Sequence, residues 1–163
     1  MIQPQMPLNK LLAIVYSDIF DFPLTSKEAG YWSISSKYRG ILRLRSGQVE
    51  KLRNLIIQRD GFCFLQKREF LVGLRLKREK YSLAKETKAR EITKILKLIP
   101  MIQAIFLTGS VAVGNTNKDA DIDLMIAVSP HSLWLTRFIV VAFLKIKGLY
   151  RAKRSVGNRI CTN

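Results

Sequence analysis

Two aspartates one residue apart, Asp121 and Asp123, are the side chains of this sequence best suited to chemistry. They open a short apolar run, residues 124–128, whose composition predicts a strand. Side chains alternate between the two faces of a strand, so both carboxylates should project to the same side. Neighbouring carboxylates repel each other unless a cation lies between them. The spacing therefore predicts a site for Mg²⁺ (or Mn²⁺), a hard ion that prefers carboxylates together with substrate phosphate oxygens.

A glycine-serine pair, Gly109-Ser110, ends the preceding apolar run, residues 102–107. Glycine allows the tight backbone turn that a bound phosphate requires, and serine offers a hydroxyl and an N–H. The order predicts a strand, a tight turn, a short helical turn and a second strand. Lys118 lies in the intervening loop, either as a phosphate contact or as a plain loop lysine. Gly109, Ser110 and Lys118 are therefore the candidate phosphate-binding residues, which the family resemblance described below makes candidate nucleotide-binding residues.

The sequence of this segment partly matches two other phosphate- or metal-binding motifs, but it lacks residues that each motif requires. A P-loop requires lysine where Asn115 stands, and it must open a full crossover helix before the next parallel strand. A calcium-binding EF-hand loop requires glycine where Leu124 stands and glutamate where Pro130 stands. A solvated turn is the remaining alternative, and it suits Asp119 better than the two acids that alternate with apolar residues.

The combination of a strand, Gly109-Ser110, a loop and Asp121-x-Asp123 on a strand resembles the signature of the nucleotidyltransferase superfamily, which includes DNA polymerase β. Small bacterial nucleotidyltransferases are similar in size, and the resemblance covers residues 79–163. It implies an α/β (α+β) fold, a small mixed sheet with flanking helices. It also implies transfer of a nucleoside monophosphate from an NTP to an unidentified acceptor, a nucleic acid or a protein, with Asp121 and Asp123 as catalytic metal ligands.

The resemblance further implies a third carboxylate, on the strand that follows the crossover helix. The sequence has no Asp or Glu after Asp123, and Asn158 and Asn163 stand in the neighbourhood. An amide cannot take up a proton as a carboxylate does. Three interpretations stay open: a C-terminally truncated product, an enzyme with two acids and a different base, or a catalytically weak protein. The last would act as a nucleic-acid-binding regulator or a toxin–antitoxin-type partner.

The net charge of +16 predicts a polyanionic partner, namely nucleic acid, nucleotide or an anionic surface. A solubilising basic surface is the alternative. The charge is uneven, because seven Lys and Arg residues follow Asp123 without any acid.

Cysteine and histidine content excludes several classes of protein. Cys63 and Cys161 are far apart in apolar runs, which predicts reduced, buried thiols and a cytoplasmic protein. A single histidine, His131, excludes a zinc site.

The first ten residues lack a secretory signal. Charged residues interrupt the apolar stretch 133–150, which falls short of the roughly 20 residues of a membrane span and predicts a buried crossover helix and no membrane association.

The N-terminal part, residues 1–68, has the element order of a winged helix. Apolar periodicity predicts helices over residues 8–20, 26–33 and 48–58, with a capping box at Thr25 and a cap at Ser46. A strand over residues 62–65 follows the Asp60-Gly61 turn. Such domains bind DNA through the third helix and the wing, or serve as packing modules. The candidate DNA contacts are Lys51, Arg53, Lys67 and Arg68.

A long basic connecting helix, residues 69–99, should join this domain to the nucleotidyltransferase-like core, residues 100–163. Its basic residues are predicted to form a solvated face. Its apolar stripe, with only Lys88 off the pattern, is predicted to contain Tyr81, Ala84, Ile92, Ile95, Leu96 and Ile99. Pro100 should stop it. A crossover helix over residues 132–149 and the start of a third strand at residues 159–162 complete the core.

Overall fold

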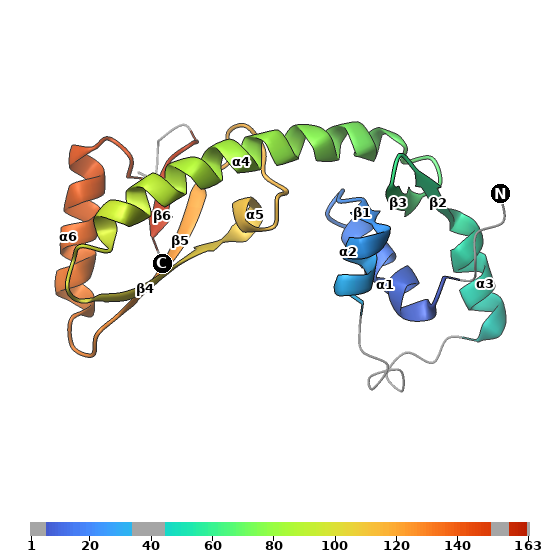
Figure 1. Cartoon of the computed structure of the whole chain (residues 1–163), viewed down its shortest axis with the longest axis horizontal. Coiled ribbons are helices and arrows are strands. Elements are labelled where there is room, and N and C mark those ends of the chain that lie inside the picture. The colour runs from blue at the N-terminus through green and yellow to red at the C-terminus, as the bar shows by residue number, and fades with distance from the viewer. Residues whose placement is uncertain (1–5, 34–44, 151–156, 163) are drawn as a thin grey trace. The chain divides into compact units, whose positions relative to one another are not determined.

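The structure, a computed structural model, describes residues 6–33, 45–150 and 157–162 of the 163-residue chain. Its contacts divide the chain into two units, Met1–Leu76 and Lys77–Asn163, each of which is described by itself. Helix α4 (Phe70–Leu96) contains the boundary between them (Figure 1). A separate connecting domain over residues 69–99 therefore stays a prediction.

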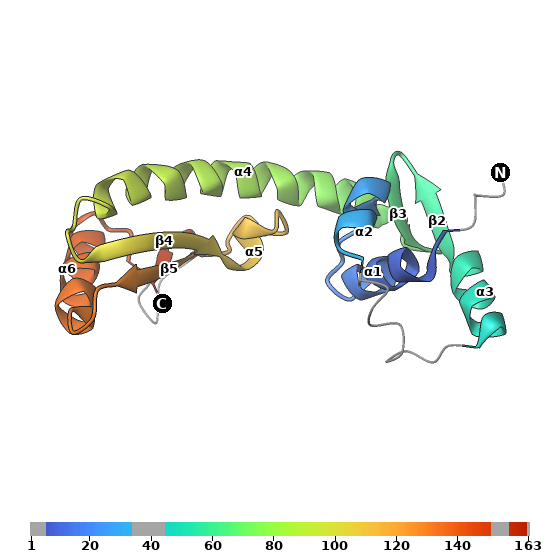
Figure 2. The ribbon, with the colours of Figure 1, turned by 60° about the horizontal axis from the view of Figure 1, so that its bottom comes forward.

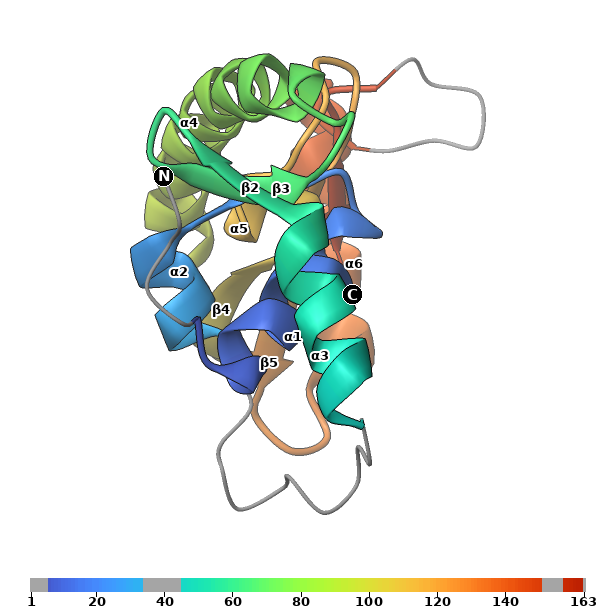
Figure 3. The ribbon, with the colours of Figure 1, turned by 90° about the vertical axis from the view of Figure 1, so that its right-hand side faces the viewer.

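The first unit combines short helices with a small antiparallel sheet. Strand β3 is central, with β1 and β2 on either side, and Figure 3 shows the hairpin of β2 and β3. Ala13, Ile14, Leu24, Ala29 and Cys63 form its buried core, which confirms the buried position expected for Cys63. The elements are α1 (Leu8–Asp18), β1 (Leu24–Thr25), α2 (Ser26–Tyr31), α3 (Ser46–Leu55), β2 (Ile56–Arg59) and β3 (Phe62–Leu65).

The predicted capping box at the start of α2 is present. The Thr25 hydroxyl accepts the backbone N–H of Glu28 at 3.2 Å, and the Glu28 carboxylate accepts the backbone N–H of Thr25 at 2.9 Å. The same carboxylate pairs with Arg75 at 2.9 Å, and the Arg75 guanidinium lies over the Phe22 ring. Arg75 is thus buried within the first unit, not on the solvated face that was expected of it.

Replacing Thr25 by Ala should lower the free energy of unfolding of the first unit by about 1 kcal/mol, the usual cost of a lost N-cap. Thr25→Ser keeps the hydroxyl and should cost less. Trp32 stands at the end of α2 and Trp134 in the second unit, so a Trp134→Phe background leaves Trp32 as the sole fluorescent reporter. Equal urea unfolding curves for the Ala and Ser variants would contradict this role of the hydroxyl.

Two predictions for α3 are wrong. Ser46 is the first helical residue and not its cap, because Arg45 occupies the cap position and its backbone N–H is bound by the Gln48 side chain at 2.9 Å. The helix also ends at Leu55, since residues 56–59 pair with β3 as strand β2. The Asp60-Gly61 turn, with φ of 52° and 82°, sets this hairpin. The winged-helix assignment itself stays a prediction.

The second unit is a mixed three-stranded sheet with helices, as predicted. The sheet order is β4-β5-β6, with β4 antiparallel and β6 parallel to the central β5, and Figure 2 shows the neighbouring strands β4 and β5. Residues of α4, α6, β5 and β6 form one buried cluster, so both helices pack on the same side of the sheet. The elements besides α4 are β4 (Ile102–Thr108), α5 (Gly109–Ala112), β5 (Ile122–Val128), α6 (Leu133–Ile146) and β6 (Ile160–Thr162).

The predicted strands and the helical turn of the core are confirmed, whereas two helix descriptions need correction. Helix α4 ends at Leu96 instead of residue 99, because a residue before proline disfavours the helical conformation. Helix α6 is buried only along Thr136, Val140 and Leu144. Its outer side chains, including Trp134 and Phe138, are exposed, so the helix is half-buried. Within the described residues, no helix combines the length and apolarity needed to cross a membrane.

Candidate functional site

The site is set by the pairing of β4 with β5, which places Thr108 opposite Asp123. The chain then turns at Gly109, whose φ of +68° favours glycine. A Cβ at this position would lie 2.6 Å from Oδ2 of Asp123. Position 109 must therefore lack a side chain for two reasons, backbone conformation and close approach. The glycine-serine corner and the Asp123 carboxylate converge, as the sequence predicts.

Asp121 and Asp123 are both half-buried. Ile122 and Leu124 are almost fully buried in the core, so Asp123 points to the opposite, open face of the sheet. Asp121 immediately precedes the strand, and its Oδ1 accepts the backbone N–H of Arg159 at 3.0 Å. This hydrogen bond holds Asp121 against the segment that enters β6.

Ser110 is held by the loop that follows α5. Its hydroxyl donates to Oγ1 of Thr116 at 3.1 Å, and Thr116 is completely buried. The backbone N–H of Thr116 in turn donates to the Ser82 hydroxyl of α4 at 3.4 Å. The Lys118 side chain is exposed, whereas its carbonyl is bound within the protein. The fold therefore fixes Ser110 near Gly109 and leaves the Lys118 amine in solvent.

Lys85 is the residue that the sequence interpretation missed. This α4 lysine is only 6% exposed. Its Nζ donates to the Lys118 carbonyl at 2.9 Å, to the Ala120 carbonyl and to Oδ1 of Asn158 at 2.6 Å. Burial lowers the pKa of Lys85, and the nearby Asp121 and Asp119 carboxylates oppose that effect. Lys85 thus joins α4 to the loop before Asp121 and to the segment that enters β6.

Within the second unit, the first part of the buried α4 stripe is shifted by one position from the predicted stripe, whereas Ile92 and Leu96 are buried as predicted. Ala84 and Ile95, expected inside, are exposed. Polar residues at the N-terminal end of the true stripe bind the loop before β5, and Arg78 adds a bond to Oδ1 of Asn115 at 2.9 Å. Because the first buried positions of this stripe are polar, a search for apolar residues at helical spacing does not detect them. The buried positions are Ser82, Lys85, Ala89, Ile92 and Leu96.

The donor set fits a cation shared with a phosphate ligand. Magnesium is usually bound through one or two carboxylates plus substrate phosphates and waters, and Asp121 and Asp123 provide two carboxylates. Among residues 6–33, 45–150 and 157–162, no group of three or more His, Cys, Asp or Glu side chains could enclose a metal. The residues therefore suit a site completed by substrate.

The side chain next to Asp123 on β6 is a thiol. The parallel register pairs Asp123 with Cys161, which is half-buried, whereas the sequence predicts a buried thiol. Ile160, on the neighbouring position, points into the core. Cys161 therefore occupies, on the open face, the position beside Asp123 that a further acid on this strand would take.

Residues 88–154 match the nucleotidyltransferase domain family. The matched segment contains β4, the Gly109-Ser110 corner and both aspartates. The match supports a relationship to the nucleotidyltransferase superfamily and a general function in nucleotidyl transfer. The match lies entirely within the second unit, which includes the C-terminal part of α4. No curated protein and no solved structure matches the chain.

Replacing Gly109 by Ala should disturb this corner of the second unit in two ways. The left-handed backbone costs a non-glycine residue roughly 1–2 kcal/mol, and the new methyl group displaces the Asp123 carboxylate. Gly114 is the matched control, since its φ is +73° and nothing lies within 4 Å of its Cβ position. Both variants should lose similar stability in urea, but only Gly109→Ala should also weaken magnesium-dependent NTP binding. Equal NTP affinity in the two variants would contradict the close approach at residue 109.

Proposed function

We propose that the protein is a metal-dependent nucleotidyltransferase that moves a nucleoside monophosphate from an NTP to an acceptor. The observation that carries the proposal is the contact between the Gly109 corner and the Asp123 carboxylate, inside the segment that matches the nucleotidyltransferase domain family. A tight glycine turn and a carboxylate that could bind a cation thus occur at one point of the fold.

In this proposal Asp121 and Asp123 hold Mg²⁺ or Mn²⁺ together with the triphosphate. The metal, when bound, supplies charge stabilisation on the α-phosphate and on the departing pyrophosphate. Gly109 and Ser110 position the phosphates, and the exposed Lys118 amine is available to neutralise them. The acceptor oxygen bonds to the α-phosphorus as the bond to the bridging oxygen breaks. Pyrophosphate leaves, and the acceptor proton passes to solvent.

Titration calorimetry of the full chain with each of the four NTPs tests this function. We expect binding in the presence of Mg²⁺ and its loss when EDTA is added. Incubation with α-labelled NTP and candidate acceptors, both nucleic acid and protein, should then transfer label and release pyrophosphate. Absence of magnesium-dependent binding for all four NTPs would overturn the proposal.

The placement of Cys161 beside Asp123 favours a second candidate, a nucleotidyltransferase-like protein that binds nucleic acid or a companion protein with little turnover. The net charge of +16 supports a nucleic-acid partner. On the first unit, Lys51 is exposed on α3, whereas Arg68 is paired with Asp18 and Asp21. DNA affinity that falls steeply with salt, without NTP affinity, would support this candidate. Co-purification of a companion would support a toxin–antitoxin-type role.

A further inference from the structure

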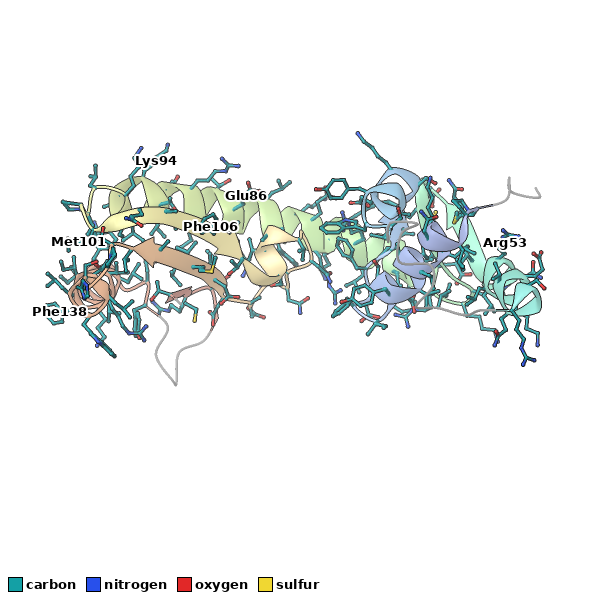
Figure 4. The ribbon with its side chains drawn as sticks, turned by 90° about the horizontal axis from the view of Figure 1, so that it is seen from below. Arg53, Glu86, Lys94, Met101, Phe106 and Phe138 are labelled. Carbon is teal, nitrogen blue, oxygen red and sulfur yellow. The ribbon has the colours of Figure 1, made fainter. Side chains whose placement is uncertain are left out.

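The open face of the second unit's sheet carries two exposed apolar side chains, Phe106 on β4 and Met125 on β5. They are 49% and 47% exposed, and the strand register places them directly opposite each other. Figure 4 looks onto this face of the sheet, with Phe106 labelled. We call this pair of side chains the apolar platform.

The platform adjoins the candidate site. Phe106 and Met125 lie two residues from Thr108 and Asp123 on their strands, and Thr108 and Asp123 are themselves paired. Residues two apart on a strand share a face and are separated by roughly 6–7 Å. An exposed aromatic and a thioether are therefore next to the carboxylate that faces Gly109.

The side chains beyond the platform are small. The next pair along the same face is Ala104 with Ala127, so neither charge nor bulk flanks the platform on that side. Large apolar side chains on a sheet face are normally covered, and single exposed ones need no explanation. A paired aromatic and thioether beside a phosphate- and metal-type site, however, match the chemistry of a flat aromatic ligand. Aromatic rings stack on nucleobases, and methionine sulfur makes favourable contacts with ring edges.

We propose that the apolar platform binds the nucleobase of the NTP whose triphosphate lies at Gly109, Ser110 and the two aspartates. This inference rests on the proposed function. Every base has a π-face, so stacking is tolerant of base identity. The register brings apolar side chains, not hydrogen-bonding ones, to this part of the face. We therefore expect weak discrimination among the four bases, with tighter binding of purines because their ring systems are larger.

The test compares ATP with inorganic tripolyphosphate, which lacks a base and sugar, by calorimetry of the full chain in Mg²⁺. Phe106→Ala should weaken ATP binding by about 5- to 150-fold, the range of stacking effects, and leave tripolyphosphate binding unchanged. Phe106→Trp should keep the ATP affinity. Phe138→Ala is the matched control, because Phe138 is 71% exposed on α6, away from the site (Figure 4).

The possible results distinguish a failure of the base-binding proposal from a failure of the proposed nucleotidyltransferase function. Unchanged ATP affinity in Phe106→Ala, with magnesium-dependent ATP binding by the wild type, overturns the platform and leaves the proposed function standing. Equal losses for ATP and tripolyphosphate also overturn it, since the substitution then acts on the phosphate site. Wild-type protein that binds neither ligand overturns both proposals. An equal loss of ATP affinity in Phe138→Ala would show a general surface effect and overturn the platform.

Discussion

Replacing Asp121 and Asp123 together by Asn is expected to abolish transfer of label from an α-labelled NTP. In the proposed mechanism, loss of both carboxylates removes the anionic ligands for the cation and the charge stabilisation that it would provide. Removing one preorganised hydrogen-bond donor that stabilises transition-state charge costs about 10²- to 10³-fold in rate, and we expect the loss of both carboxylates to cost at least as much. Magnesium-dependent NTP binding should weaken in parallel.

The fold should survive this double substitution. An Asn side-chain oxygen at position 121 can still accept the Arg159 N–H that ties the loop to β6. The change also removes repulsion between two neighbouring like charges. Asp119→Asn is the matched control, because Asp119 is an exposed acid of the preceding loop and should not alter activity. Unchanged label transfer in the double variant would remove the assignment of the two acids.

Replacing Lys85 by Met should destabilise the second unit by roughly 3 kcal/mol, because a hydrogen bond to a charged group contributes about 1.5–3 kcal/mol and buried acceptors are left unpaired. The carbonyls of Lys118 and Ala120 and the Asn158 side chain would each lose their donor. Since these groups flank Asp121 on both sides, the affinity for Mg²⁺-NTP should fall as well.

Lys94→Met on the same helix is the control for Lys85, because Lys94 is exposed (Figure 4). Unfolding can be followed through Trp134 on α6 in a Trp32→Phe background, so that the signal comes from the second unit. NTP affinity is measured separately below the unfolding transition. A Lys85→Met protein as stable as the Lys94→Met protein would show that the three hydrogen bonds contribute little.

The candidate site formed by the Gly109-Ser110 corner and the two aspartates could be predicted because these residues are close in sequence. Gly109 and Asp123 lie on two strands joined by one loop, so alternation along each strand and the need for a tight turn were sufficient to bring them together. The thiol beside Asp123 was not predicted, because the register of β6 depends on a pairing with β5 across a helix. Sequence alone indicated only that no acid was present there.

Lys85 could not be predicted from local patterns. Its partners lie 33 to 73 residues further along the chain, and a lysine on a charged helix is more often solvated. The same limit applies to Arg75, whose partner Glu28 is 47 residues away. The error in α3 has another origin, since Ile56 and Ile57 fit an apolar helical stripe and a strand equally well until the hairpin turn decides between them.

The bond between Arg159 and Asp121 has a consequence for the order in which the protein matures. It links residues 38 apart, and β6 is the last described element of the chain. Domains generally fold as units during synthesis, N-terminal parts first, and contacts between distant residues close slowly. The first unit can thus be folded while a ribosome still holds the residues that anchor Asp121. A nascent chain should therefore reach the final geometry around Asp121 only after β6 has been synthesised, so the first unit is folded before the candidate site is complete.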